Sequence, residues 1–257
     1  MQYISCRTLL YFYTDIMGLK YKVNECFFDR WSNEMAYVLG YMFADGSLED
    51  AHYLRGKYVR VTSTDLDRIT SIKRLLSSEH TIVKRETDDR RKKRYMLRIG
   101  SHALFDRLNT LGVTPRKSLT MCFPAVPSRF LPSFTRGYFD GDGCVYIGHS
   151  PGGTSRLTTI FTSGSEKFLS SLKDALNSSA KIAQGTLHSH GSTKGTYQLR
   201  FFARDSMHLF DFMYPRHLHK DLLLYRKYAI FTRYFDEIRL SASRRMSKYI
   251  PAGHVAK

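Results

Sequence analysis

The chain has 257 residues, 42% of them hydrophobic, which is enough for one large domain or two small ones with cores of their own. Its 40 Lys and Arg residues against 23 Asp and Glu residues give a net charge of +17, and this favours a polyanionic partner, most simply a nucleic acid. No apolar run approaches the roughly 20 residues that span a bilayer, so the composition argues against a membrane protein.

A short, distinctive sequence motif follows the N-terminal part of the chain. Residues 1–31 are rich in aromatic side chains and are expected to form a packed extension with a helix at 8–17. The motif is Leu39-Gly40-Tyr41-Met42-Phe43-Ala44-Asp45-Gly46. Gly40 and Ala44 would share one face of a helix, and small residues there let a second helix approach closely. Asp45 would then stand at the helix end, with Gly46 as a natural stop.

The motif and the elements after it recur roughly 100 residues later. The first unit continues with a strand to Ser63, a helix over 65–76, paired strands to Arg98 and a helix over 103–111. The second copy of the motif is Arg136-Gly137-Tyr138-Phe139-Asp140-Gly141-Asp142-Gly143, followed by a strand to Ser163, a helix over 165–176, paired strands to Arg200 and a helix over 206–213.

This duplication predicts an α+β fold of two pseudo-symmetric units, each in the order helix, strand, strand, helix, strand, strand, helix. The expected divisions are an N-terminal extension over 1–31, a first unit over 32–124, a second unit over 125–238 and a loose basic tail over 239–257.

Two aspartates at helix ends, Asp45 and Asp142, form the candidate site. A carboxylate is disfavoured at a helix C-terminus, and two carboxylates brought together repel each other. A bound divalent cation removes both objections, because hard cations such as Mg²⁺ take carboxylate oxygens and keep positions open for phosphates. The alternative is two ordinary helix ends with Asp-Gly turns. The matched surroundings of the two copies favour the metal site.

The cysteines say little about function. Cys6, Cys26, Cys122 and Cys144 are scattered and include no Cys-x-x-Cys pair, so a zinc site is not expected. Such sparse use fits a reducing compartment, and the N-terminus lacks the layout of a signal peptide. An intracellular location is expected, in the cytoplasm or nucleoid, or in an organelle of a eukaryote.

Residues 25–236, which contain both copies of the motif, resemble the LAGLIDADG homing endonucleases. Besides the two motifs, three segments are typical of bacterial and phage members: Glu34-Met35-Ala36-Tyr37-Val38, Leu111-Gly112-Val113-Thr114-Pro115-Arg116-Lys117-Ser118 and Tyr225-Arg226-Lys227-Tyr228. The resemblance implies two αββαββα units that meet along their motif helices, with Gly40, Ala44, Gly137 and Gly141 at the interface. Their antiparallel sheets would form a saddle that lies on DNA.

The resemblance also implies the activity: a monomeric, metal-dependent endonuclease that cuts both strands of a long asymmetric DNA site. Asp45 and Asp142, with Ala44 and Gly141, would hold Mg²⁺ or Mn²⁺, and Ca²⁺ is expected to bind without supporting cleavage. The basic catalytic residues would be Lys117 and Lys220, whose alternative role is plain phosphate contact. Many members carry a Gln or another polar residue where this chain has Ser63 and Ser163, and helix capping is the other reading of these serines.

The sheet faces would contact DNA, since alternation along a strand separates core-facing from outward-facing side chains. The expected DNA-binding residues are Arg60, Lys84, Arg94, Arg98, Gln198 and Arg200. Arg and Lys match the acceptors of guanine in the major groove. Two alternatives stay open: an RNA-splicing maturase, with intron RNA as its partner, and a transcription regulator, both with the same fold and no cleavage.

Overall fold

The computed structural model describes residues 21–51, 56–85, 93–115, 119–150, 154–180, 182, 185–189, 195–215, 218–219 and 222–248. Beyond residue 241 only the backbone of the last helix is described. The helix expected over 8–17 and the candidate residues Lys117 and Lys220 lie outside these ranges.

The first unit follows the expected order of elements. Its elements are α2 (Asn33–Asp45), β1 (Gly46–Ala51), β2 (Gly56–Ser63), α3 (Leu66–Leu75), β3 (Ile82–Arg85), β4 (Arg94–Gly100) and α4 (His102–Thr110). All pairings in its sheet are antiparallel, and the strand order is β1-β2-β4-β3.

The second unit repeats this arrangement. After a 3₁₀ turn, η3 (Ser128–Phe130), its elements are α5 (Leu131–Asp142), β5 (Gly143–His149), β6 (Ser155–Ser163), α6 (Glu166–Ser179), β7 (Thr186–Ser189), β8 (Tyr197–Phe202) and α7 (Ala203–Met213). The sheet is again antiparallel, in the order β5-β6-β8-β7. The α+β fold of two pseudo-repeated units is therefore confirmed.

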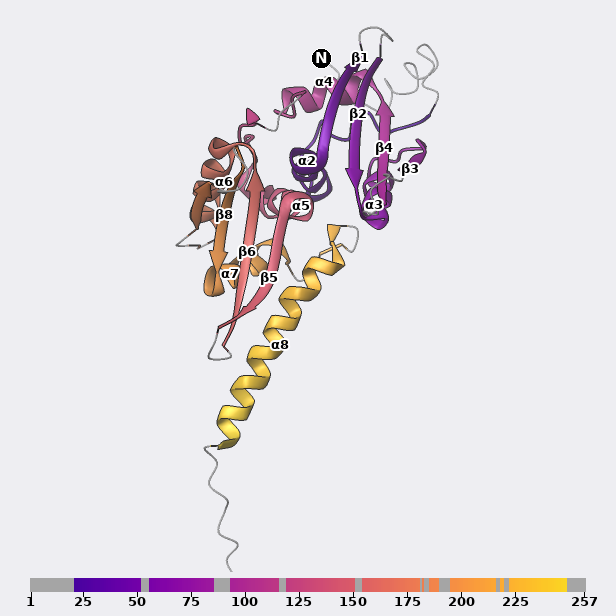
Figure 1. The fold of residues 1–257 in the computed structure, drawn as a ribbon. Coiled ribbons are helices and arrows are strands. Elements are labelled where there is room, and N and C mark those ends of the chain that lie inside the picture. The colour runs from indigo at the N-terminus through magenta and orange to yellow at the C-terminus, as the bar shows by residue number, and fades with distance from the viewer. Residues whose placement is uncertain are drawn as a thin grey trace, which may run out of the picture.

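The two units meet along α2 and α5, which lie side by side at the centre with one sheet on either side (Figure 1). Nine consecutive residues of α2, Met35–Phe43, are buried, because this helix is enclosed by its partner helix and by the sheets. The strands alternate as the pattern indicated. Leu97 and Ile99 of β4 are fully buried, whereas Arg98 between them is only half-buried.

A further helix, α8 (Tyr225–Lys248), follows the second unit, runs along β5 and β6 and extends past them (Figure 1). Its buried positions Lys227, Phe231 and Tyr234 recur at helical spacing. The expectation of a loose tail from residue 239 is wrong as far as Lys248. That stretch contains Leu, Ala, Arg, Met and Lys, which are good helix formers and extend a helix already anchored by packing.

The structure bears on membrane insertion and on the state of the cysteines. Among the described helices, none is long and apolar enough to cross a membrane. Cys122 and Cys144 are free thiols, and Cys26 is disulfide-bonded.

Candidate functional site

Glycines allow the central helices to touch backbone to backbone. A Cβ added at Gly40 would lie less than 3.0 Å from the backbone of Phe134 on α5. The pseudo-symmetric Gly137 is equally tight against the backbone of Tyr37 on α2. A backbone atom cannot swing aside as a side chain can, so neither position has room for a larger residue.

The contact continues to the ends of the two helices. A Cβ at Gly141 would collide with the Cβ of Ala44 and would lie 3.5 Å from a carboxylate oxygen of Asp45. The C-terminus of α5 is therefore next to the motif aspartate of α2. The four small residues expected at the helix interface all lie in this contact.

Each motif helix passes directly into a strand. Gly46 and Gly143 have extended backbones, with φ of −87° and −85°. These glycines are thus not the left-handed helix stops that the sequence suggested. They are required for another reason: a Cβ would lie less than 3.0 Å from the carbonyl oxygen of Met42 or Phe139, which accepts the glycine's own N–H. This tight junction fixes where the preceding aspartates stand.

Asp45 is half-buried and Asp142 is exposed. Burial raises the pKa of the Tyr138 hydroxyl, and the charge of Asp142, with a smaller contribution from Asp45, raises it further. Burial likewise raises the pKa of Tyr41, and the charge of Asp45, to which Tyr41 is hydrogen-bonded, adds to the effect. Because both carboxylates act on Tyr138, their negative charges are concentrated at the joint end of the helix pair.

The two serines at the strand ends occupy matching positions. The Ser63 hydroxyl lowers the pKa of Tyr41, and the Ser163 hydroxyl lowers that of Tyr138, against the raising effect of burial. Each serine Oγ also accepts the backbone N–H two residues later, at distances of 3.1 and 3.0 Å. The helix N-caps themselves are Asp65 and Ser165, so the serines stabilise the turn before each helix and are not its cap.

A pocket of about 350 Å³ opens at the end of the helix pair. Its lining is polar and comes from both units and from α8: Asp45, Thr62, Ser63, Thr64, Arg94, Asp140, Gly141 and Arg226. Carboxylate, hydroxyl and guanidinium groups thus converge on one cavity beside the end of α5. Such a convergence is typical of a binding or catalytic site.

The comparisons with known proteins agree with this architecture. Residues 130–212 match the family model of the LAGLIDADG-like domain. The chain has the LAGLIDADG fold. A structure of mesophilic variants of the homing endonuclease I-DmoI has a TM-score of 0.52 and 18% identity, covering 73% of this chain and 98% of that one. The homing endonuclease I-WcaI, bound to its DNA recognition sequence, has a TM-score of 0.53 and 13% identity over 82% of this chain and 97% of that one.

A third structure is a variant of I-DmoI in complex with its target DNA in the presence of Mn. It has a TM-score of 0.52 and 18% identity, and it covers 74% of this chain and 97% of that one. No curated protein matches the chain in sequence. The resemblance to the LAGLIDADG homing endonucleases is thereby confirmed for the fold and for the second unit.

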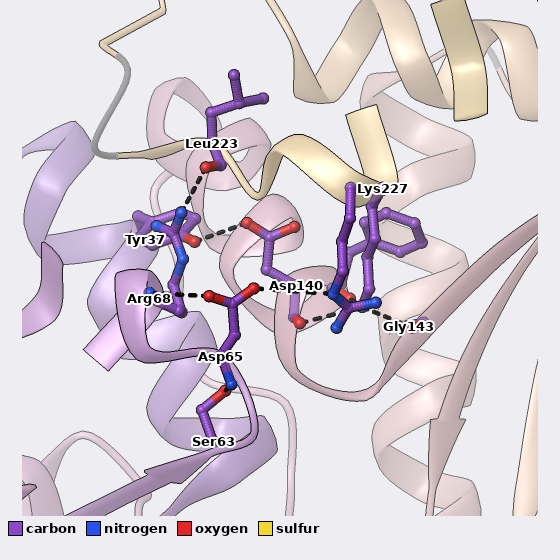
Figure 2. Close-up of polar contacts among 10 residues, drawn as sticks. Tyr37, Ser63, Asp65, Arg68, Asp140, Gly143, Leu223 and Lys227 are labelled. Atoms are coloured by element: carbon purple, nitrogen blue, oxygen red, sulfur yellow. Dashed lines mark hydrogen bonds and ion pairs between the residues drawn. The ribbon is translucent and has the colours of Figure 1, made fainter. Parts of the chain in front are cut away.

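Sequence reasoning missed a buried charged cluster beside the LAGLIDADG helices (Figure 2). Tyr37 donates a hydrogen bond of 2.6 Å to Oδ2 of Asp140, which is buried, while Oδ1 of Asp140 has no hydrogen-bond partner among the residues that the structure describes. Burial raises the pKa of Asp140, against the opposing charges of Lys227, Arg68 and Arg136. The repeat concealed this residue, because the first copy of the motif has Phe43 at the same position.

Lys227 ties α8 to the end of α5. Its Nζ donates hydrogen bonds to the carbonyl oxygens of Phe139, Asp140 and Gly143, at 2.5, 3.0 and 2.6 Å (Figure 2). Burial lowers the pKa of this ammonium to about 8, although the charge of Asp140 opposes the shift. A lysine at the C-terminus of a helix satisfies carbonyls that have no partner within the helix and counters its dipole.

The expected DNA-binding side chains lie on the sheets, and they differ in exposure and in whether neighbouring side chains already bind them. Arg98 is engaged, because it is bonded to both carboxylate oxygens of Glu49 at 3.1 and 3.0 Å and lies 3.4 Å above the ring of Tyr58. Arg60 donates to Ser47 at 3.0 Å. The other candidates are placed as follows: Lys84 and Arg94 are exposed on β3 and β4, and Arg200 donates to Gln198 at 3.0 and 2.6 Å on β8.

The donor set at the helix ends fits a hard divalent cation in part. Within the described ranges, no three His, Cys, Asp or Glu side chains come together as a metal site. Two aspartates alone leave coordination positions for main-chain oxygens, water and phosphate, and Mg²⁺ usually binds through one or two carboxylates with several such ligands. The site is therefore suited to an ion that is completed by a phosphate substrate.

Proposed function

We propose that this chain is a site-specific endonuclease that cuts both strands of duplex DNA with a divalent cation. The observation that carries the proposal is the pair of aspartates, Asp45 and Asp142, each the last residue of one of two helices that pack through glycine. Two carboxylates at helix C-termini cost stability unless they hold a cation. The position of the two aspartates therefore favours a role in metal binding over a role in stability.

Double-stranded DNA is the proposed partner. The net charge of +17 favours a polyanion, and Arg and Lys side chains lie on the outer faces of the sheets. I-WcaI and the I-DmoI variant, which share the fold, were solved with their DNA targets. One chain already contains both LAGLIDADG helices, so a monomer is proposed to span the whole site, in a host locus such as an intron insertion point.

The proposed roles at the site follow from the chemistry of a phosphodiester. Asp45 and Asp142, with main-chain oxygens of Ala44 and Gly141, would hold Mg²⁺ or Mn²⁺. Such an ion supplies charge neutralisation and a more acidic water when bound. Lys117 and Lys220 remain the proposed basic residues that stabilise the developing charge on the cut phosphate. Lys227 and Tyr37, by contrast, fix the helix end from which Asp142 projects.

A cleavage assay tests the proposal. The substrate is a supercoiled plasmid that carries the insertion locus without its intron, or a site selected from a random library, incubated with Mg²⁺, Mn²⁺, Ca²⁺ or EDTA. Linear product is expected with Mg²⁺ and Mn²⁺ only, and Ca²⁺ should give binding without product. Cleavage in EDTA would contradict the role of the metal. Tight binding to intron RNA with no DNA cleavage in Mg²⁺ would instead support the maturase alternative.

A further inference from the structure

Arg226 brings a positive charge to the pocket of Asp45 from α8, the helix that follows the repeated elements of both units. It is the second residue of α8, and it lines the same cavity as Asp45 and Gly141. Its side chain is 60% exposed. The cavity of about 350 Å³ has space on the order of ten water molecules, so an anion of phosphate size can reach the guanidinium.

The position of Arg226 is fixed from both units. Asp65, the N-cap of α3, lies 3.8 Å from Nε of Arg226. The preceding segment is held by two buried arginines: Arg68 of the first unit donates to the carbonyl of Leu223, and Arg136 of the second unit donates to that of Leu222 at 2.7 Å. A single long ion pair leaves most of the five guanidinium N–H donors available for another acceptor.

Arg94 lines the same cavity from the start of β4 and is exposed. The lining therefore holds two guanidinium groups beside the carboxylates of Asp45 and Asp140. Guanidinium groups bind phosphate oxygens in a planar, two-bonded geometry. Both features point to a phosphate group as the ligand of this end of the pocket.

Neither arginine has a positively charged counterpart at the pseudo-symmetric position. Tyr95 and Tyr197 pair in the same way with Ser63 and Ser163, so the counterpart of Arg94 is Thr196. The last helices of the two units, α4 and α7, end 103 residues apart, at Thr110 and Met213, so the counterpart of Arg226 is Phe123. The two halves of the pseudo-symmetric site therefore differ in positive charge.

We infer that Arg226, with Arg94, binds the DNA phosphate that is cut on the Asp45 side, and that the two strands are consequently cut with different dependence on Arg226. The inference rests on the proposed nuclease function. It assigns a phosphate-binding role to a residue of α8, the helix that follows the αββαββα elements of the second unit.

The first test follows each strand separately. The two strands of a target duplex are labelled at different ends, and single-turnover cleavage is measured for the wild-type chain, Arg226→Gln and Arg233→Gln. Arg233 is the control, because it lies on the same helix, is 65% exposed and, within the described part of the chain, forms an ion pair with Glu237 at 4.0 Å. Arg226→Gln should slow one strand at least about tenfold more than the other, so that duplex nicked in a single strand accumulates.

The outcomes separate the two proposals. Equal slowing of both strands by Arg226→Gln, or the same effect from Arg233→Gln, would overturn the inference while leaving the nuclease intact. If the wild-type chain cuts neither strand, the proposed function fails and the inference fails with it. Arg226→Lys should recover part of the lost rate, since lysine keeps the charge without the planar fork.

The second test needs no metal. Affinity is measured in EDTA for a duplex with normal phosphates and for duplexes with one neutral methylphosphonate at either cut position. If Arg226 binds one of these phosphates, Arg226→Gln should weaken binding to the normal duplex several-fold. On the duplex that is neutral at that position, Arg226→Gln should cause little further loss of affinity, because the contact that it removes is already absent. Such non-additive losses are the coupling expected for two groups in contact. Absence of coupling at both positions would overturn the inference.

Discussion

At the scale of single residues, His80 shows how burial sets a protonation state. Its ring is 8% exposed; Nε2 accepts the N–H of Gly100 at 3.3 Å, and Nδ1 lies 3.0 Å from the hydroxyl of Ser78. A protonated ring has no acceptor for Gly100. Burial lowers the pKa of His80 below its usual value, as does the charge of Lys73, while Glu79 acts in the opposite direction.

This lowered pKa predicts a loss of stability in mild acid. As the pH falls through about 6.5, the unfolded chain takes up the proton at His80 before the folded chain does, so the free energy of unfolding decreases. Urea unfolding at about pH 7.5 and about pH 5.5 measures the effect, with His80→Gln as the comparison. The wild-type chain should lose more stability than the variant between the two values. An equal loss in both would show that His80 does not contribute.

At the scale of elements, the packing of α2 against α5 depends on two glycines. Gly137→Ala places a methyl group against the backbone of Tyr37 and should lower the free energy of unfolding by about 3 kcal/mol or more. Gly148→Ala on β5 is the control, because a Cβ there would meet nothing nearer than 3.7 Å. That change should cost under about 1 kcal/mol. Similar losses from both variants would contradict the close approach of the helices.

The sequence was most informative about this same helix pair. Small residues four apart are a local pattern, and its recurrence about 100 residues later showed that two such helices exist in one chain. The position of α8 could not be predicted from such a local pattern. Arg226 lines the Asp45 pocket, and just before it Arg68 of one unit and Arg136 of the other hold the carbonyls of Leu223 and Leu222. Those contacts join residues far apart in the sequence and leave no periodic signal.

At the scale of the whole molecule, the surplus of positive charge predicts strongly salt-dependent binding. If about eight phosphates are neutralised, the slope of log K against log salt should be near −7. Fluorescence anisotropy with a labelled target duplex over a series of salt concentrations gives this slope. A value shallower than about −2 would mean that the net charge of +17 is not directed at DNA.

The internal duplication predicts one chain per DNA duplex. The two sheets differ in the side chains they expose, for example Arg94 against Thr196, so the preferred site should be asymmetric. Sedimentation of the protein–DNA complex at concentrations that support cleavage gives the stoichiometry. Two chains per duplex, or a perfectly palindromic site from library selection, would contradict a single chain that reads both halves.

The central claim is that Asp45 and Asp142 together form a metal-dependent cleavage site. Asp45→Asn and Asp142→Asn keep the size of each side chain and remove its charge. The control is Asp174→Asn, at an exposed carboxylate on α6 outside the pocket lining. The most direct test is to measure binding and Mg²⁺-dependent cleavage of one target duplex by all three variants. The account predicts that both motif variants bind the duplex but do not cut it, while Asp174→Asn does both. Cleavage at the wild-type rate by both motif variants would contradict it.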